Sequence, residues 1–520
     1  MDYILNPLLY LVLFLSLYLI SKHFHRKFKN HPPAPFLTLP LLGHLYLFKK
    51  PLHRALTNIS NRHGPVLLLE FGSRKVLLVS SPSAAEECLS KHDVVFANRP
   101  RLMAGKYIGC NYTSLAWTSY NDHWRNLRRI AAIEILSTHR LQMLHDIRAD
   151  EVNFMIRKLD SSSKAGAPVE MKTVFFELML NLMMRMIAGK RYFGENVEDL
   201  KEANRFREIL TETLAISGVS NVGDFVPSLK MVFRSLEKRF VNVQRNTDAF
   251  MQDLIDECRK QIAENISSGD DSTEPAGKNK KKKKSFVQVL LTLQENEPEY
   301  YQDEIIRGLV SVMLAAGTDT SSGTLEWALS LLLNHPQLLK KVQREIDERV
   351  GHERLLEESD LANLPYLNCI IKETMRMYPV GPLLIPHESS EECTVAGYRV
   401  PAGTMLMINV YSIQRDPKNW DDPEKFRPER FQGLEGVMRD GYKMMPFGSG
   451  RRSCPGEGLA LRMVGLSLGS LIQCFDWERI GSEMVDLTEG IGLTMPKASP
   501  LTAICKTRPF VAHLLSQTGV

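Results

Sequence analysis

The pattern of apolar and polar positions divides the chain into an apolar N-terminal run, a hinge and a long body. Residues 3–20 contain no charged side chain, and residues 31–45 are rich in proline. Two apolar runs within 64–81 are typical of the paired strands of a short hairpin. From there to about residue 378, apolar positions recur mainly with helical spacing. The pattern therefore predicts a mainly helical body behind an apolar leader.

The C-terminal part of the chain changes character twice. Residues 379–445 are irregular and rich in proline, and they contain short apolar runs typical of strands, such as 394–413. Residues 458–475 then have the length and the apolar face of a helix. No internal repeat is present, and no linker divides the body. We therefore expect one domain that is mainly α with small β-sheets.

The apolar run at the N-terminus predicts a membrane anchor. Its uncharged stretch reaches the lower limit for a spanning helix, Asp2 precedes it, and a basic cluster from Lys22 to Lys29 follows it. A cleavable signal peptide would instead be basic before its apolar run. The positive-inside rule places the basic side, and hence the body, in the cytosol. We expect a single-pass anchor at 1–21, a basic and proline-rich hinge at 22–45, and the body of the protein at 46–520.

Composition narrows the class of protein. The chain is 44% hydrophobic and 24% charged, which is typical of a globular protein rather than a disordered one. Its net charge of +5 is small for a nucleic-acid binder, so no nucleic-acid partner is expected. The eight cysteines are scattered and form no CxxC pair, which indicates reduced thiols on the cytosolic side of the membrane.

One polar stretch interrupts the helical pattern. Residues 265–285 switch from acidic to basic and have no apolar period, so they predict a disordered surface loop. The lysine run at 278–284 would also suit a nuclear signal or a patch for anionic lipid. The membrane anchor argues against the nucleus, and a solvated loop is the simplest interpretation.

A single cysteine lies in an unusual setting near the C-terminus. Phe447, Gly450, Arg452, Cys454 and Gly456 follow the spacing F-x-x-G-x-R-x-C-x-G. The glycines allow tight turns and a close approach to a flat ligand. The start of a helix, with its free N–H groups, favours a thiolate, and a thiolate can serve as the axial ligand of haem iron. The alternative is a buried structural cysteine beside a basic loop.

A second motif lies within an apolar helical pattern. Residues 315–322 read AAGTDTSS, and Gly317 inside a helix costs about 1 kcal/mol relative to alanine. Thr318, Asp319 and Thr320 place hydroxyls and an acid where a core helix would have aliphatic side chains. Such an acid–alcohol pair suits proton transfer. The alternative is a polar stripe where helices pack.

Two further motifs have helical spacing. Glu373 and Arg376, three residues apart, can form an ion pair, which would contribute little if it were exposed. Trp124 and Arg128, four residues apart, lie on one face of a predicted helix.

These motifs, in this order, strongly resemble those of the cytochrome P-450 superfamily of haem-thiolate monooxygenases. The resemblance runs from about residue 31 to the C-terminus and implies the cytochrome P-450 fold with an N-terminal single-pass membrane anchor. It implies haem b as cofactor, with Cys454 as the iron ligand. It also implies that Asp319 and Thr320 help to deliver the two protons that O–O cleavage needs.

The resemblance assigns roles to further residues. Haem-binding positions would be Trp124, Arg128, Ala316, His387, Phe447, Arg452 and Gly456. Of these, Trp124, Arg128 and His387 would contact the propionates, although His387 taken alone could be only a polar neighbour. Arg430 in FRPERF would join Glu373 and Arg376 in a structural triad that braces the haem side of the fold.

The same resemblance implies an enzyme of the endoplasmic reticulum membrane whose catalytic domain faces the cytosol. Its partners would be O2, membrane lipid, a hydrophobic small molecule and an NADPH–cytochrome reductase that supplies the electrons. Lys443, Arg451 and Arg452 could dock that reductase. The other function class is a haem-thiolate protein that does not activate oxygen: a dehydratase, an isomerase or a haem sensor. Such members typically lack the threonine, so Thr320 favours the monooxygenase.

Several sequence segments resemble those of plant microsomal enzymes, most of all those of the branch that contains the isoflavone 2′- and 3′-hydroxylases. That implies hydroxylation of an aromatic, phenylpropanoid-type substrate, such as an isoflavonoid or flavonoid. The branch also includes methylenedioxy-bridge formation on lignans, indole glucosinolate oxidation and detoxification of xenobiotics, so the product stays open. The pocket walls would come from about 100–120, 210–226, the helix around Ala316, 380–385, and 493–494.

Overall fold

The computed structural model describes most of the chain: residues 2–35, 37–194, 200–217, 222–228, 234–267, 284–434 and 441–517. Most of the predicted surface loop, residues 268–283, lies outside the described residues. The first part of that predicted loop, 265–267, belongs to a helix, because the helical pattern of the preceding segment continues into it.

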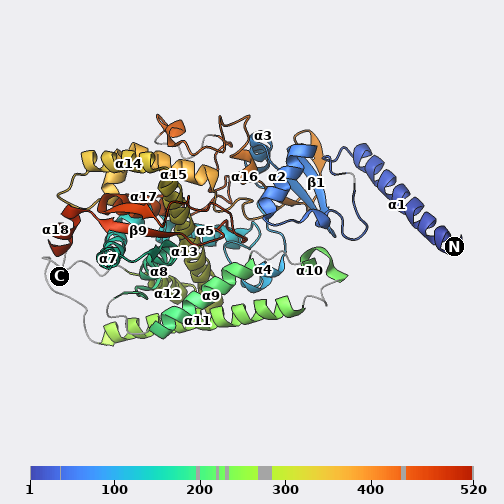
Figure 1. Ribbon diagram of the computed structural model, residues 1–520. Helices are drawn as coiled ribbons and strands as arrows, with labels where there is room; N and C mark the ends of the chain where they lie inside the picture. Colours follow the sequence, from blue (N-terminus) through green and yellow to red (C-terminus); the bar gives the residue numbers. More distant parts are fainter. Residues whose placement is uncertain are drawn as a thin grey trace.

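The described part of the chain is mainly helical (Figure 1). Its helices are α1 (Asp2–Phe28), α2 (Leu52–His63), α3 (Pro82–Glu86), α4 (Met103–Tyr107), α5 (Asp122–Glu134), α6 (Thr138–Met143), α7 (His145–Lys164), α8 (Met171–Ala188), α9 (Leu200–Ser217), α10 (Val222–Phe225), α11 (Arg234–Ser267), α12 (Phe286–Asn296), α13 (Asp303–Asn334), α14 (Pro336–Arg349), α15 (Pro365–Met377), α16 (Val410–Ile413), α17 (Glu457–Cys474) and α18 (Pro509–Gln517). Short helical turns add η1 (Leu45–Leu47), η2 (Glu87–Lys91), η4 (Glu358–Asn363) and η5 (Pro428–Phe431).

Three small sheets accompany the helices within the described ranges. Their strands are β1 (Val66–Phe71), β2 (Arg74–Val79), β3 (Val169–Glu170), β4 (His387–Glu388), β5 (Cys393–Val395), β6 (Tyr398–Val400), β7 (Met405–Ile408), β8 (Phe475–Arg479) and β9 (Thr502–Thr507). The strand orders are β1-β2-β7-β4, β3-β9-β8 and β5-β6. The predicted hairpin at 64–81 is the antiparallel pair β1–β2, and β7 joins β2 in parallel. The mainly α class with small sheets is therefore confirmed.

Helix α13 crosses the centre of the body, where it packs against α8, α17, α11 and α15 (Figure 1). Asp303 and Glu304 in its first turn suit the positive end of the helix dipole. The helix continues without a break through Gly317. A Cβ atom at Gly317 would lie 2.6 Å from the Sδ atom of Met183 on α8. Glycine at this position thus permits the close approach of α8 and α13.

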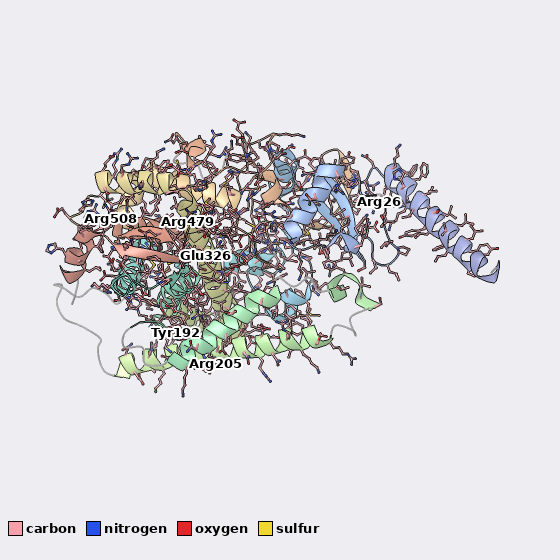
Figure 2. All side chains as sticks on the ribbon, viewed as in Figure 1. Arg26, Tyr192, Arg205, Glu326, Arg479 and Arg508 are labelled. Carbon is pink, nitrogen blue, oxygen red and sulfur yellow. The ribbon has the colours of Figure 1, made fainter. Side chains whose placement is uncertain are left out.

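Helix α1 extends away from the body, and most of its apolar side chains from Leu9 to Ile20 are exposed (Figure 1). It continues beyond the predicted anchor boundary at residue 21 as far as Phe28. Lys22 and Arg26, one helical turn apart, both pair with Glu70 on β1, and Figure 2 shows Arg26 beside the sheet. This contact explains why part of the predicted hinge is helical. Among the described residues, no helix combines the length and the apolar content that crossing a membrane requires.

Candidate active site

The segment that contains Cys454, here called the cysteine loop, runs from Phe447 to Gly456 just before α17. Glycines shape its backbone. Gly448 and Gly450 have φ values of +68° and +72°, which other residues rarely adopt. The backbone N–H of Cys454 donates to the carbonyl of Phe447 across 2.9 Å, and this bond closes the loop. Gly456 caps the N-terminus of α17. The predicted spacing therefore does place Cys454 at the start of a helix.

The thiol of Cys454 is accessible, whereas five other cysteines of the chain are buried. The pKa of Cys454 is nevertheless raised, because the surrounding protein desolvates the thiolate. The N–H groups of Gly456 and Glu457 and the charge of Arg128 lower this pKa, but they do not outweigh desolvation. The helix terminus thus acts in the expected direction, toward a thiolate, but desolvation has the larger effect on the pKa. A bound cation at the sulfur would supply the missing stabilisation.

Two predicted arginines lie beside this loop. The guanidinium of Arg452 donates from Nε to the carbonyl of Ala97 at 2.7 Å and stacks over Trp124, with 4.5 Å between Cζ and the ring centroid. Arg128, on α5, donates from Nη1 to the carbonyl of Ser453 at 2.7 Å. Burial lowers the pKa of Arg452 to about 9, and the charge of Arg128 contributes to this shift. The two guanidiniums are thus held by backbone carbonyls.

His387 and a residue that sequence reasoning missed, Arg99, belong to the same basic cluster. His387 donates from Nδ1 to the carbonyl of Phe96 at 2.7 Å, if Nδ1 carries the proton as this partner requires. Arg99 donates to the carbonyls of Ile385 and Pro386, each at 2.8 Å. Burial holds the pKa of His387 well below its usual range, and the neighbouring charge of Arg99 adds to this shift. Burial also lowers the pKa of Arg99, and the charge of Arg452 contributes. The sequence signal that could have indicated Arg99 is a charged residue within the largely apolar segment VVFANRP.

The basic cluster, defined as Arg99, Arg128, His387 and Arg452, fits an anionic cofactor. In the part of the chain that the structure describes, none of these four groups pairs with a carboxylate. Buried cations without counter-charges are costly, and a ligand bearing carboxylates would compensate them. A haem ligated through Cys454 would bring two propionates to this region. The donor set therefore fits haem.

The acid and the alcohols of the AAGTDTSS motif have different surroundings. Thr320 donates from Oγ1 to the carbonyl of Ala316 at 2.7 Å, and Ala316 is exposed although α13 is central. Burial raises the pKa of Asp319. Among the described residues, Oδ2 of Asp319 and Oγ1 of Thr318 are buried without a hydrogen-bond partner. The motif thus holds a desolvated acid one residue before a hydroxyl that faces the same side as Ala316.

The predicted triad forms one buried contact network. Arg376 donates to both carboxylate oxygens of Glu373, at 2.6 and 2.9 Å, and both side chains have 0% exposure. Arg430 donates from Nε to Oε1 of Glu373 at 3.0 Å. Arg376 also donates to the carbonyls of Gln414 and Pro423, and Arg430 also donates to that of Asp421. The network joins α15 to η5 and the loop before it.

The three residues predicted to dock a reductase differ in exposure. Arg452 is half-buried, and its guanidinium donates to the carbonyls of Ala97 and Thr118. Arg451 is exposed but pairs with Asp93 at 3.1 Å, and Lys443 is exposed. Arg452 is therefore poorly suited to docking, and docking of a reductase through Lys443 and Arg451 stays a prediction.

Replacing Gly450 with alanine is expected to damage the cysteine loop. The new Cβ would lie 2.4 Å from the backbone oxygen of Leu89, and the positive φ adds strain. We expect a loss of more than about 2 kcal/mol in unfolding free energy, together with reduced haem content. Gly397→Ala is the matched control, because φ is +80° there but nothing lies within 4 Å. Equal thermal stability of the two variants would contradict the prediction.

The sequence of the chain matches the family described as Cytochrome P450 over residues 32–502. Cytochrome P450 81Q32 of Catharanthus roseus is 50% identical over 496 residues, or 95% of each chain. An isoflavone 2′-hydroxylase of Glycyrrhiza echinata is 46% identical over 520 residues, which cover 99% of this chain and all of that one. A (+)-piperitol/(+)-sesamin synthase of Sesamum radiatum is 47% identical over 491 residues, with 94% and 93% covered.

The accessible thiol, the uncompensated basic cluster and the acid–alcohol motif agree with this full-length similarity. The chain therefore belongs to the cytochrome P450 family of haem-thiolate monooxygenases.

Proposed function

We propose that this protein hydroxylates a hydrophobic aromatic plant metabolite, an isoflavonoid, a flavonoid or a related phenylpropanoid. The observation that carries the proposal is the similarity over nearly the whole chain to an isoflavone 2′-hydroxylase. Isoflavone 3′-hydroxylase of Medicago truncatula is similar to the same degree, at 47% identity. Both names describe the hydroxylation of an isoflavone.

The chain's own residues would hold the cofactor in the following way. Cys454 would ligate the iron, and Trp124, Arg128, His387 and Arg452 would meet the propionates. Ala316, Phe447 and Gly456 would contact the ring. When bound, haem b supplies the activation of O2 with electrons that come from NADPH through a reductase. Glu373, Arg376 and Arg430 would brace the cysteine side without touching the reacting atoms.

Asp319 and Thr320 would handle protons at the oxygen-binding side. The desolvated carboxyl of Asp319 has a raised pKa, so it can carry a proton nearer to neutral pH than an exposed aspartate. The hydroxyl of Thr320 can rotate between the carbonyl of Ala316 and a ligand, because a hydroxyl both donates and accepts. This pair also favours a monooxygenase over a dehydratase or isomerase.

Thr320→Ala is expected to uncouple the enzyme. NADPH consumption should continue while product formed per NADPH falls by at least about tenfold and hydrogen peroxide accumulates, since a positioned proton donor contributes roughly 100-fold or more. Thr324→Ala is the control, because Thr324 makes the same kind of bond one turn later, to the carbonyl of Thr320 at 2.9 Å. Unchanged coupling in Thr320→Ala would refute the proton role.

Ring-bridge formation is the second candidate. The synthase of Sesamum radiatum named for piperitol and sesamin is as similar as the hydroxylases. Both reactions begin with oxidation of a C–H bond, and they differ in whether a neighbouring oxygen then closes a ring. Indole glucosinolates and xenobiotics are further substrates to test. The product mass separates the cases, because hydroxylation adds one oxygen whereas ring closure removes two hydrogens.

We also propose that α1 anchors the protein in the endoplasmic reticulum membrane with the body in the cytosol, with an anchor at 1–21, a hinge at 22–45 and the catalytic domain at 46–520. Exposed apolar side chains such as Leu11, Phe14 and Leu17 support the proposal, since they would otherwise face water. The full chain should stay with microsomes after carbonate extraction. Release of the full chain by carbonate would contradict the anchor.

The function is tested with microsomes that contain the full chain and a plant reductase. With NADPH, a panel of isoflavones, flavonoids, lignans and indole glucosinolates should yield product from the first two classes. Omission of NADPH and the Cys454→Ala variant are the controls. Turnover confined to lignans would favour ring-bridge formation, and binding spectra without any turnover would contradict the hydroxylase proposal.

A further inference from the structure

The last turns of α1 are fastened to the body by one carboxylate. Lys22 and Arg26 both pair with Glu70 on β1, and the Arg26 contact joins Nη2 to Oε1 at 2.7 Å. The side chains of Lys22, Arg26 and Glu70 are 24%, 14% and 20% exposed, so the contact is largely shielded from water. Figure 2 shows Arg26 where α1 meets the body. This contact, here called the Glu70 clamp, holds the C-terminal end of α1 against the sheet.

The chain that follows α1 is fastened to the sheets as well. Nδ2 of Asn30 donates to the carbonyl of Gly397 at 2.9 Å, and the N–H of Arg399 on β6 donates to the carbonyl of Asn30 at 2.8 Å. Further on, the N–H of Leu68 on β1 donates to the carbonyl of Pro33 at 3.0 Å. These backbone bonds continue the attachment beyond the end of the helix.

His44 attaches the proline-rich segment from inside the fold. It has 0% exposure, and its Nδ1 accepts the N–H of Glu70 at 2.9 Å. Because Nδ1 is an acceptor, Nε2 carries the proton and faces the carbonyl of Pro35 at 3.2 Å and the hydroxyl of Thr38 at 3.1 Å. Burial lowers the pKa of His44 to about 4, so the ring is neutral near neutral pH. Glu70 therefore holds α1 through its side chain and the proline-rich segment through its backbone.

The face of α1 opposite the Glu70 clamp is apolar and exposed. Leu17, Ile20, Phe24 and Phe28 are three or four residues apart, so they form one stripe along the helix. Their exposures are 69%, 48%, 65% and 91%. Residues two apart on a helix point to nearly opposite sides, which places the two basic residues of the clamp away from this stripe. The stripe therefore continues from the proposed anchor into the turns that the clamp holds.

We propose that the Glu70 clamp sets the orientation of the body on the membrane: it holds α1 in one direction, so that the stripe ending at Phe24 and Phe28 enters the lipid surface. The occupant is lipid because the stripe continues the exposed apolar face of the proposed anchor. Lys27 and Lys29, both exposed, follow at the same end of the helix, where anionic headgroups would attract them. The inference rests on the proposed membrane anchor and adds to it a fixed tilt of the body.

A fixed tilt depends on a stiff connection between the anchor and the body. A flexible linker would let the body sample many orientations. The clamp and the bonds at residues 30–44 instead couple the axis of α1 to the sheet. Removal of both ion pairs should shift the balance between held and released orientations by roughly tenfold, since each pair of this kind contributes modestly.

The first test measures linear dichroism of the haem Soret band in the full chain, reconstituted in oriented bilayers that contain phosphatidylserine. The wild type should give a dichroic ratio set by one tilt, and Glu70→Gln should move that ratio toward the value of a randomly oriented sample. Glu478→Gln is the matched control, because Glu478 on β8 also pairs with a lysine, Lys506 on β9, at 2.6 Å. An unchanged ratio in Glu70→Gln would refute the clamp.

Variants on the helix side keep this test decisive. Lys22→Gln combined with Arg26→Gln removes the same ion pairs and leaves the sheet unchanged, so its ratio decides the outcome if Glu70→Gln loses haem. Glu70→Lys should disturb the ratio at least as strongly as Glu70→Gln. Adding Arg26→Glu to Glu70→Lys should restore part of the wild-type ratio, because an ion pair forms again with reversed charges. Lack of any restoration would contradict a direct ion pair.

The lipid contact is tested on the stripe itself. Phe24→Gln combined with Phe28→Gln should change the dichroic ratio, whereas Phe24→Leu combined with Phe28→Leu should keep it. An unchanged ratio in the glutamine variant would overturn the lipid assignment, and loss of cross-linked dimers in that variant would show that the stripe binds a second copy of the chain instead.

Carbonate extraction separates this inference from the proposed anchor. If the wild-type chain is released from the membrane, the anchor itself fails. If the wild type and Glu70→Gln both stay in the membrane and share one dichroic ratio, the anchor stands and the clamp is wrong. Retention of Glu70→Gln with loss of its tilt is the result expected.

Discussion

Cys454→Ala is expected to abolish the red-shifted Soret band of the reduced, carbon monoxide-bound protein. That band requires a thiolate on the iron, and Cys454 is the cysteine that combines an accessible sulfur with the basic cluster around it. Monooxygenase activity should fall to background in the same variant. The measurement is the carbon monoxide difference spectrum of membranes that express the full chain.

The control for this prediction is Cys393→Ala. Cys393 lies on β5 and is partly buried. It should keep both the band and the activity. A band that persists in Cys454→Ala would overturn the assignment of the iron ligand. Loss of the band in both variants would point to general misfolding, which circular dichroism of the purified proteins would detect.

Glu373→Gln is expected to lower the free energy of unfolding by about 3–5 kcal/mol. The substitution keeps the volume but leaves Arg376, with 0% side-chain exposure, and Arg430 without their carboxylate. Burial already lowers the pKa of Arg376, and Glu373 is the group that opposes this shift. Thermal unfolding and haem content of the purified variant measure the effect.

The matched control is Lys425→Gln. Lys425 and Asp422 are also three residues apart, but their side chains are 70% and 51% exposed, so this ion pair should contribute about 0–1 kcal/mol. The two substitutions therefore compare the same spacing in opposite environments. Equal unfolding temperatures for the two variants would show that the buried triad does not brace the fold.

The sequence predicted much of the fold, because its main signals are local. Apolar spacing indicated the mainly helical body, and the two apolar runs near residue 70 indicated β1 and β2. The boundary of α1 was less well predicted. The helix continues through the basic cluster because Lys22 and Arg26 find Glu70, and that partner lies more than forty residues away along the chain.

The candidate site was only partly predicted, because only residues that are neighbours along the chain form a recognisable pattern. Cys454 and the glycines around it form a contiguous pattern, so their placement at a helix start could be read directly. Arg99 could not be found in this way, because it joins the basic cluster from a loop that precedes α4. Such a residue carries no motif of its own.

The sequence by itself determined the family, the cysteine, the acid–alcohol pair and the triad, since each depends on identity and spacing within a few residues. The tertiary structure decided the electrostatics. It bound the Arg452 guanidinium to backbone carbonyls, and it gathered four basic groups that pair with no carboxylate among the described residues. It also raised the pKa of Cys454 although the helix terminus acts in the opposite direction. The physical reason is desolvation, which depends on how distant segments pack around a group and not on its neighbours along the chain.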